Sequence, residues 1–314
     1  MPLSDPYRIL VCDPVDTEGL EMLKKAGCLV DVVSDLSIEE LKAAIPSYDV
    51  LIVRSRTKVT SELIAAGDRL KIIGRAGAGL DNIDLEEAEK RNVIVLNTPE
   101  AVSDAVAELT VGLMITLVRR ISEADRLMKE GVWAKKRLKG TQLKGKTLGL
   151  IGLGRIGLRV ARLARAFGMR ILVTKRTPPS EELMKELGGR FVTLEKLLKS
   201  SDIVSLHVPL TEETRYMIRE KELNLMKKGA LLINTSRGGL IDHDALIRAL
   251  ASGKLGGVAL DVYEKEPPVN LELLKFQNVI CTPHIGAQTR EAQREASILL
   301  AKKILEKLKL PSAL

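Results

Sequence analysis

Three histidines are the only imidazole groups in this 314-residue sequence, so the choice of a general acid or base is narrow. His284 follows a strand expected at 278–281, and His207 follows another expected at 203–206. His243 lies in a polar stretch where a helix is expected to begin, and we interpret it as a solvated surface residue. Because function gathers at the carboxyl ends of strands in doubly wound sheets, His284 and His207 are the candidates for proton transfer.

Two charged residues follow expected strands of the same kind. Arg237 comes after the one at 230–234 and offers a planar fork for a substrate carboxylate. Glu266 comes after the one at 257–260 and could pair with a histidine, which would favour the imidazolium form. From the residues alone, a His–Glu pair with an arginine fits a structural ion-pair network as well as a catalytic set.

Other kinds of chemistry find little support. A Ser–His–Asp hydrolase is disfavoured because the sequence has no G-x-S-x-G turn. No cluster of His, Cys and carboxylates has the spacing of metal ligands, so no metal is expected. Cys12, Cys28 and Cys281 are odd in number and far apart, which favours a reduced, cytoplasmic protein.

The elements that would position these groups are clearest in residues 147–176. An apolar run at 147–151 predicts a buried strand, residues 158–167 have apolar side chains at helical spacing, and 171–173 predicts the next strand. Between the first strand and the helix lies Gly152-Leu-Gly154-Arg-Ile-Gly157. In this strand–helix–strand setting, G-x-G-x-x-G is the fingerprint of a dinucleotide-binding turn.

Each of these glycines has a physical role in such a turn. Gly152 permits the tight bend, Gly154 lets the backbone approach a pyrophosphate, and Gly157 lets helix and strand pack closely. The exposed amides and the dipole at the helix start favour the phosphate charge. The alternative is a plain βαβ unit in which the glycines are incidental.

The position that selects the cofactor departs from the usual pattern. A fold that prefers NAD places Asp or Glu about twenty residues after the glycines, to hold the ribose hydroxyls. Here that position is Lys175, followed by Arg176. Two cations suit a 2′-phosphate, although they could equally be solvated charges beside a bound NAD. The expected cofactor is therefore NAD(H) or NADP(H), with a slight lean toward tolerance of NADP(H).

A second glycine-rich segment, 74–79, follows another expected strand. Its spacing differs from G-x-G-x-x-G, and it leads into a turn at 80–84 and no helix. A loop of small residues with free amides, beside Arg75, suits a carboxylate better than a pyrophosphate. A simple tight turn fits this loop equally well.

Length and composition indicate a globular protein with two domains, and the alternation of strands with helices indicates the α/β class. In residues 1–100, five apolar runs alternate with short helical segments, which implies parallel strands and right-handed crossovers in a small flavodoxin-like domain. No apolar run approaches ~18 residues, so no membrane span is expected. The 49 basic residues are balanced by 41 acidic ones and aromatics are 3%, which disfavours a nucleic-acid partner and favours a basic site for anionic ligands.

Four segments together resemble successive signatures of the D-isomer-specific 2-hydroxyacid dehydrogenases: 152–157, 234–239, 261–267 and 283–287. The likeness runs over nearly the whole chain, in order and with the spacing of that family. Segments 53–60 and 74–84 look most like the phosphoglycerate dehydrogenase branch, which begins phosphorylated serine synthesis. The chain ends at Leu314, so we expect none of the regulatory domains of longer members within it.

The resemblance implies a domain organisation. Residues 101–287 would form the cofactor domain, a Rossmann-type doubly wound parallel sheet, and residues 1–100 with 288–314 the smaller substrate domain. The family forms homodimers largely through its cofactor domains. This would explain the very apolar helix expected at 101–120 and the arm near Trp133.

The resemblance also implies roles for the residues. His284 would exchange the proton of the C2 hydroxyl, Glu266 would orient it, and Arg237 would bind the carboxylate while hydride passes between C2 and nicotinamide C4. Expected substrate contacts are Arg54, Arg75, Ala76, Gly77, Ala78, Gly79, Arg237 and His284, with Lys135 a weaker candidate from the neighbouring arm. Expected cofactor contacts are Gly152, Gly154, Arg155, Ile156, Gly157, Lys175, Arg176, His207, Val208, Pro209, Thr235, Ser236, Arg237, Asp261, His284, Gly286 and Ala287.

Two other functions remain open. A glyoxylate or hydroxypyruvate reductase of the same family is favoured by the Lys175-Arg176 pair, whereas the basic stretch at 54–58 favours a phosphorylated substrate. A non-enzymatic scaffold that senses NADH, like the corepressors sharing this fold, is a more distant alternative. Such a scaffold would bind NADH with little turnover.

Overall fold

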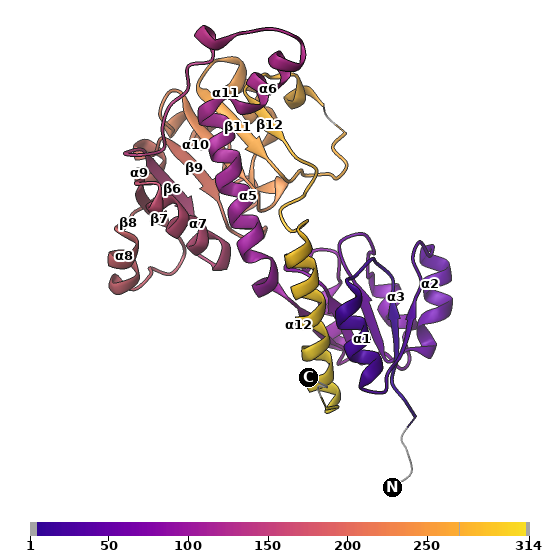
Figure 1. The fold of residues 1–314 in the computed structure, drawn as a ribbon. Helices are drawn as coiled ribbons and strands as arrows, with labels where there is room; N and C mark the ends of the chain where they lie inside the picture. The colour runs from indigo at the N-terminus through magenta and orange to yellow at the C-terminus, as the bar shows by residue number, and fades with distance from the viewer. Residues whose placement is uncertain (1–4, 270, 312–314) are drawn as a thin grey trace. The chain divides into compact units, whose positions relative to one another are not determined.

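The computed structural model describes residues 5–269 and 271–311 (Figure 1). The chain divides into two compact units, one of Met1–Ser103 with Ala287–Leu314 and one of Asp104–Gly286. These bounds lie close to the boundaries expected at residues 100 and 287. Residues 312–314, the end of the expected substrate domain, lie outside the described residues.

The first unit is built on a five-stranded parallel sheet in the order β2-β1-β3-β4-β5. This 2-1-3-4-5 order is that of flavodoxin-like folds, which confirms the expected architecture. The strands are β1 Arg8–Val11, β2 Leu29–Val32, β3 Val50–Val53, β4 Ile72–Arg75 and β5 Ile94–Asn97. The helices are α1 Thr17–Lys25, α2 Ile38–Ala44, α3 Ser61–Ala66, α4 Leu85–Lys90 and the returning α12 Arg290–Leu308.

Helix α12 is part of the first unit because its apolar face is buried there. Leu300 and Ile304 pack into the same cluster as the residues of β1 and β3. At the contact with α1, a Cβ on Gly19 would lie 2.3 Å from the Ser297 carbonyl oxygen, so the two helices approach closely because position 19 has no side chain.

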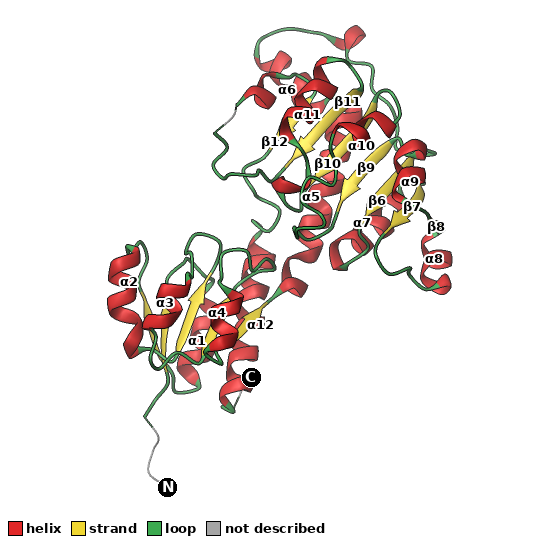
Figure 2. Ribbon diagram, turned by 180° about the vertical axis from the view of Figure 1, so that it is seen from behind, coloured by secondary structure: helices red, strands yellow, loops and turns green. Residues whose placement is uncertain are grey.

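The second unit has a seven-stranded parallel sheet in the order β12-β11-β10-β9-β6-β7-β8. The first strand of this sheet along the sequence is β6, and β7 and β8 follow on one side of it. The next strand, β9, lies on the other side of β6, as in a doubly wound fold. The strands are β6 Thr147–Ile151, β7 Arg170–Thr174, β8 Gly189–Phe191, β9 Ile203–Leu206, β10 Ala230–Asn234, β11 Leu255–Leu260 and β12 Val279–Cys281. The helices are α5 Pro99–Arg119, which belongs to this unit from Asp104 onward, α6 Ile121–Lys129, α7 Arg155–Ala166, α8 Glu181–Leu187, α9 Leu194–Ser200, α10 Glu220–Leu225 and α11 His243–Ala251. Figure 2 shows helices flanking the strands in each unit.

A short α-helix and a short strand were not expected from the sequence. Helix α4 buries a single residue, Ala88, and begins where the Asp84 side chain accepts a hydrogen bond from the Glu87 amide. Strand β8 has three residues at the edge of its sheet, and none of them is buried. Neither element carries enough buried apolar residues to produce a readable period.

Helix α5 departs from the expectation that no segment of the sequence is apolar enough to span a membrane. Among the described residues it is the one helix with the length and hydropathy of a membrane span, although 56% of its most apolar stretch is buried inside the structure. Leu113, Met114 and Val118 pack in one cluster with residues of β6 and β7. A buried core helix meets the same criteria of length and composition, so the helix is a weak indication of a membrane.

Candidate active site

The glycine turn after β6 is built as tightly as its sequence predicts. Gly152 has a φ of 97°, and a Cβ there would lie 2.3 Å from the carbonyl oxygen of His207. A Cβ on Gly157, in the first turn of α7, would lie 2.5 Å from the carbonyl oxygen of Gly152. Any side chain at either position would therefore push strand, turn and helix apart.

Gly154 has the opposite surroundings. It is the N-cap of α7, no side chain caps the helix start, and a Cβ on Gly154 would meet no heavy atom within 4 Å. The amide groups at the start of a helix attract an anion, and here the approach to them is open. The turn thus fits the pyrophosphate of a dinucleotide.

His207 lies beside this turn and is unsuited to donate a proton at neutral pH. Its Nε2 is 2.9 Å from the hydroxyl of Ser205, and its buried Nδ1 has no partner among the described residues. Burial lowers the pKa of His207 to about 4, so its imidazole is neutral at pH 7. Of the two histidines that the strand ends suggested, His284 is therefore the remaining candidate for proton transfer.

His243 was predicted to be a solvated surface residue, and this prediction is wrong. It is half-buried at the first position of α11, and its buried Nε2 has no partner among the described residues. It lines a cavity of about 10 Å³ together with Tyr263 and Glu264. That volume is the size of one water molecule.

The loop after β10 is shaped from inside by Asn234. The Asn234 side chain is fully buried; its Nδ2 donates to the carbonyl oxygen of Arg237 (2.8 Å) and its Oδ1 accepts from the amide of Ser236 (3.0 Å). The Ser236 hydroxyl donates to the Leu206 carbonyl oxygen, and the Thr235 hydroxyl is 2.9 Å from that of Thr110. The hydroxyls expected at the cofactor are thus bonded within the fold.

The sequence analysis did not single out Asn234. The available signal is a short amide side chain at a strand end, which readily bonds its own backbone two residues further on.

His284 and Glu266 form a hydrogen-bonded pair, with 2.7 Å between Nδ1 and Oε2. Burial alone would raise the pKa of Glu266, but hydrogen bonds from His284 and the Tyr263 amide, with the charges of His284 and Arg237, hold that pKa below its ordinary value. An ionised Glu266 accepts the proton on Nδ1, which leaves Nε2 of His284 for proton exchange. The two side chains are 46% and 38% exposed, so a substrate can reach them.

Arg237 completes this group from the neighbouring strand. It follows β10, is half-buried, and one of its guanidinium nitrogens donates to the carbonyl oxygen of Ser236 (2.6 Å). Arg237, Glu266 and His284 follow β10, β11 and β12, which are adjacent in the parallel sheet. The carboxyl ends of these strands lie at one edge, where a cation, a carboxylate and an imidazole come together.

The remaining residues expected at the cofactor are open to varying degrees. Lys175 is half-buried directly after β7 and has no hydrogen-bond or ion-pair partner in the part of the chain that the structure describes. Arg176 is almost fully exposed, 4.0 Å from Glu213. The other members of the expected set are exposed or half-buried Arg155, Ile156, Val208, Pro209 and Ala287, and buried Asp261 and Gly286.

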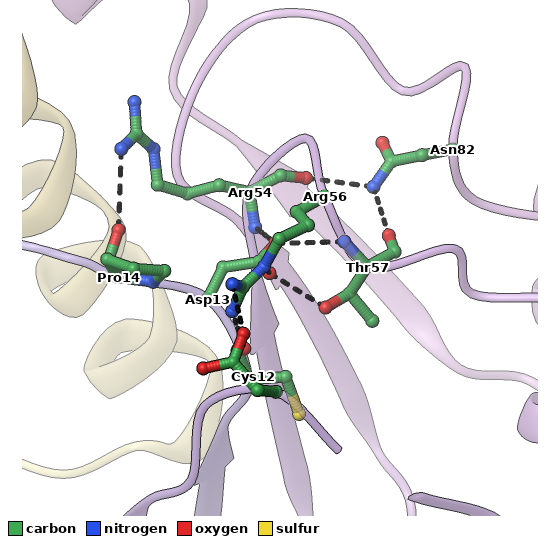
Figure 3. A network of polar contacts seen from close by, with 8 residues as sticks. Cys12, Asp13, Pro14, Arg54, Arg56, Thr57 and Asn82 are labelled. Atoms are coloured by element: carbon green, nitrogen blue, oxygen red, sulfur yellow. Dashed lines mark hydrogen bonds and ion pairs between the residues drawn. The ribbon is translucent and has the colours of Figure 1, made fainter. Parts of the chain in front are cut away.

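In the first unit, a buried carboxylate organises the loop that carries Arg54 (Figure 3). Asp13 is 1% exposed and accepts hydrogen bonds from the Arg54 amide (2.6 Å) and the Thr57 hydroxyl (2.8 Å). From the other side, Asn82 Nδ2 donates to the carbonyl oxygens of Arg54 (2.8 Å) and Thr57 (2.7 Å). The backbone of this loop is thereby fixed.

The two arginines of this loop are used differently. Arg56 pairs with Asp13 and Asp35, and also donates to the carbonyl oxygen of Cys12. The Arg54 guanidinium makes one contact, 3.4 Å to the Pro14 carbonyl oxygen, and no ion pair among the described residues. Burial lowers the pKa of Arg54, with the charge of Asp13 opposing the shift. Arg54 is thus a partly desolvated cation without a bonded carboxylate.

The second glycine loop presents free amides. The carbonyl oxygens of Gly77 and Ala78 accept hydrogen bonds from the Thr98 amide (2.8 Å) and from Asn97 Nδ2 (2.7 Å). The amides of Ala78 and Gly79 have no hydrogen-bond partner among the described residues. This is the arrangement that a carboxylate site requires.

Two expectations concern other kinds of site. No group of three or more His, Cys, Asp or Glu within residues 5–269 and 271–311 could hold a metal ion. Lys135, the weaker substrate candidate, is exposed in a short turn at Lys135–Arg137 of the second unit.

Comparison with known proteins supplies the family. The profile of the family described as D-isomer specific 2-hydroxyacid dehydrogenase, NAD binding domain, matches residues 111–286. A hydroxypyruvate reductase of Thermotoga maritima is 48% identical over 305 residues, which are 96% of this chain and 98% of that protein. A D-3-phosphoglycerate dehydrogenase of Methanocaldococcus jannaschii is 47% identical over 96% of this chain, which spans 57% of that longer protein.

Among solved structures, D-lactate dehydrogenase from Aquifex aeolicus, complexed with NAD and lactic acid, has a TM-score of 0.85 and 33% identity, covering 96% of this chain and 95% of that one. The matched family, the parallel doubly wound sheet and the glycine turn agree on a nicotinamide-dependent oxidoreductase. The chain therefore belongs to the D-isomer-specific 2-hydroxyacid dehydrogenases.

Proposed function

We propose that the chain transfers a hydride between a nicotinamide cofactor and C2 of a phosphorylated D-2-hydroxy acid, 3-phosphoglycerate, in the direction of serine synthesis. The observation that supports a phosphorylated substrate concerns Arg54. Its side chain is a half-buried cation with no ion pair among the described residues, and its loop is fixed by Asp13 and Asn82. A desolvated cation of this kind gains most from an anion that binds it.

The chemistry at C2 follows from the three residues at the edge of the second sheet. During oxidation, Nε2 of His284 takes the proton of the C2 hydroxyl, and during reduction it returns that proton to the oxygen. Glu266 stabilises the imidazolium that forms, since it accepts from Nδ1 at 2.7 Å. Arg237 binds the substrate carboxylate and polarises the C2 carbonyl. The bound nicotinamide supplies the hydride acceptor or donor.

The free amides of Ala78 and Gly79 support a second anion contact in the first unit. We assign them to the substrate carboxylate, and Arg54 and Arg75 to the phosphate end. Arg75 lies over its own loop, because a Cβ on Gly77 would lie 1.8 Å from an Arg75 guanidinium nitrogen. The φ of Gly77 is 147°, a backbone conformation that residues with a side chain rarely adopt, so glycine is favoured at this position.

A substitution at Arg54 tests the substrate class. Arg54→Gln should lower kcat/KM for 3-phosphohydroxypyruvate about 100-fold, because one bond to a charged group contributes about 1.5–3 kcal/mol. The rate with hydroxypyruvate, which has no phosphate, should stay within about threefold of wild type. Lys58→Gln removes an exposed cation of the same loop and should leave both rates unchanged. An equal loss with both acids at Arg54→Gln would assign Arg54 a structural role.

A reductase for the small acids is the second candidate. The Thermotoga maritima hydroxypyruvate reductase matches this chain over 98% of its own length, whereas the matched phosphoglycerate dehydrogenase is much longer. For such an enzyme the expected substrates are hydroxypyruvate and glyoxylate, and Arg54→Gln would then have little effect on either.

For the cofactor, we propose that NADPH is accepted as well as NADH. Lys175 occupies the place where a carboxylate would repel a 2′-phosphate, and its ammonium has no partner among the described residues. Lys175→Asp should shift the ratio of kcat/KM for NADPH over NADH downward by about tenfold or more. An unchanged ratio would remove Lys175 from cofactor selection.

We also propose that the protein is a homodimer. The segment from α6 to the following arm exposes Ile121 (45%), Met128 (55%) and Trp133 (77%). Large apolar side chains gathered on one segment are typical of a protein contact, and a second copy is the partner we propose. Sedimentation at micromolar concentration should give twice the mass of one chain, and a monomer would contradict the proposal.

A further inference from the structure

The residues on both sides of His284 are held by one buried carboxylate. We propose that Asp261 is a positioning residue, which acts on the reaction by fixing the backbone that carries His284. The inference rests on the proposed function, in which His284 exchanges the proton at C2. It differs from the role that the family resemblance implies, in which Asp261 contacts the cofactor.

Asp261 directly follows β11 and is 1% exposed. Its Oδ1 accepts hydrogen bonds from the Thr282 hydroxyl (2.7 Å) and the Ile285 amide (2.8 Å). Its Oδ2 accepts from the Gly286 amide (2.9 Å). The donors lie before and after His284 in the chain, so the carboxylate spans the turn that presents the imidazole.

The backbone at His284 needs such support. Its φ is 53°, in the left-handed region, which is sparsely populated by residues with a side chain. A residue held in that region costs energy, and the conformation persists only where the surroundings fix it. The His284 amide donates to the Thr282 carbonyl oxygen at 3.1 Å, so the turn is tight, and Asp261 accepts from the next two amides.

The close approach of the loop to Asp261 depends on Gly286. A Cβ there would lie 3.1 Å from Asp261 Oδ2 and 3.2 Å from a methyl carbon of Val106 in α5. A buried carboxylate is stable where enough donors surround it, and Asp261 has three. An asparagine amide would turn an NH₂ group toward at least one of these donors and lose its hydrogen bond.

Tyr263 connects this loop with that of Glu266. Its hydroxyl donates to the Thr282 carbonyl oxygen (3.0 Å), and its amide donates to Glu266 Oε1 (3.1 Å). Oε2 of the same carboxylate accepts from His284. Asp261 and Tyr263, which we call the His284 clamp, therefore set the position of His284 relative to Glu266.

The two roles considered for Asp261, positioning of His284 and binding of the cofactor, predict different kinetics for its substitution. The Asp261 carboxylate is bonded to three groups of its own chain and has almost no exposed surface. If it acts through His284, its substitution lowers kcat and leaves cofactor affinity unchanged. If it binds the cofactor, the substitution weakens cofactor binding and leaves kcat at saturating cofactor close to wild type.

The experiment compares Asp261→Asn and Tyr263→Phe with wild type. For Asp261→Asn, kcat with a 2-keto acid at saturating NADH should fall about 100-fold, which is the effect of a misplacement of about 1 Å. The NADH dissociation constant, from nucleotide fluorescence, should stay within about threefold. Tyr263→Phe should lower kcat about tenfold. Tyr216→Phe is the matched control, since its hydroxyl bonds Glu264 outside the clamp, and its kcat should equal wild type.

Amide exchange supplies a readout that does not depend on turnover. In Asp261→Asn the Ile285 and Gly286 amides should lose protection, while the β6 amides keep theirs. If wild type reduces no 2-keto acid with NADH or NADPH, the proposed function fails, and this exchange measurement still decides on the clamp. Should Asp261→Asn fail to fold, Thr282→Val removes one of the three donors and should lower kcat about tenfold with an unchanged NADH constant.

Three results would overturn the proposal. A tenfold or larger rise in the NADH dissociation constant with kcat preserved would make Asp261 a cofactor ligand. A wild-type kcat with only a lower melting temperature would make it purely structural. Unchanged protection at Ile285 and Gly286 would show that the carboxylate does not hold the turn.

Discussion

The bond between Glu266 and His284 gives the sharpest test of the proton transfer. Glu266→Gln keeps the size of the side chain and an oxygen for the Nδ1 proton, but removes the charge that stabilises the imidazolium. A hydrogen bond to a charged group contributes about 1.5–3 kcal/mol, which we reduce to about 1–2 kcal/mol because both side chains are more than a third exposed. The predicted fall in kcat for oxidation is therefore about 5- to 30-fold.

The assay follows kcat and kcat/KM for oxidation from pH 6 to 9 in wild type, Glu266→Gln and Glu264→Gln. The pKa of Glu266 is held below its ordinary value, so its charge is present over this whole range and its loss should be felt at every pH. Glu264 lies on the same loop and bonds Tyr216, so its variant should behave as wild type. A kcat for Glu266→Gln within about twofold of wild type, with the same pH profile, would refute the reasoning.

Two further predictions concern stability and cofactor binding. The pKa of His207 is about 4 in the folded chain, against an ordinary value of 6.5. As the pH falls below 6.5, His207 is therefore protonated in the unfolded chain but stays neutral in the folded chain, which favours unfolding. This difference should lower the unfolding free energy by up to about 3 kcal/mol between pH 6.5 and 4. Urea unfolding of His207→Gln should not show this pH-dependent loss of stability. A variant with the same pH dependence as wild type would contradict the prediction. Gly154→Ala should keep stability within about 0.5 kcal/mol, because its Cβ meets open space, but should weaken NADH binding about tenfold. Gly157→Ala, whose Cβ would lie 2.5 Å from the Gly152 carbonyl oxygen, should instead lower the unfolding free energy by about 1–3 kcal/mol. Equal effects of the two alanines on binding would contradict the roles given to these glycines.

The fold could be predicted where local patterns are strong. Buried strands such as 147–151 are continuous apolar runs, and the glycine turn combines an apolar strand with a helix of clear period. The strand ends that carry Arg237, Glu266 and His284 could be located for the same reason. Helix α4 and strand β8 were not predicted because each buries at most one side chain and so leaves no periodic pattern in the sequence.

What could not be predicted depends on contacts between segments far apart in the chain. His243 lines a small cavity with Tyr263 and Glu264, which lie about twenty residues later in the chain, and the sequence around α11 gives no sign of this neighbourhood. Likewise, Asp261 could be read as a cofactor residue from its motif, but its bonds to Ile285 and Gly286 exist only once β11 and β12 lie side by side. Arg54 and Arg56 are the same residue type on one loop, and the structure shows that Arg56 is paired.

The central claim is hydride transfer to a phosphorylated 2-keto acid, and a substrate comparison tests it most directly. The purified protein is assayed with 3-phosphohydroxypyruvate, hydroxypyruvate and glyoxylate, using NADH and NADPH in parallel. The account predicts that kcat/KM for the phosphorylated acid exceeds that for either small acid by about a hundredfold or more, as expected for a charge-assisted contact at Arg54. Equal or faster reduction of hydroxypyruvate or glyoxylate, above all with NADPH, would contradict it and make the protein a reductase of small 2-keto acids.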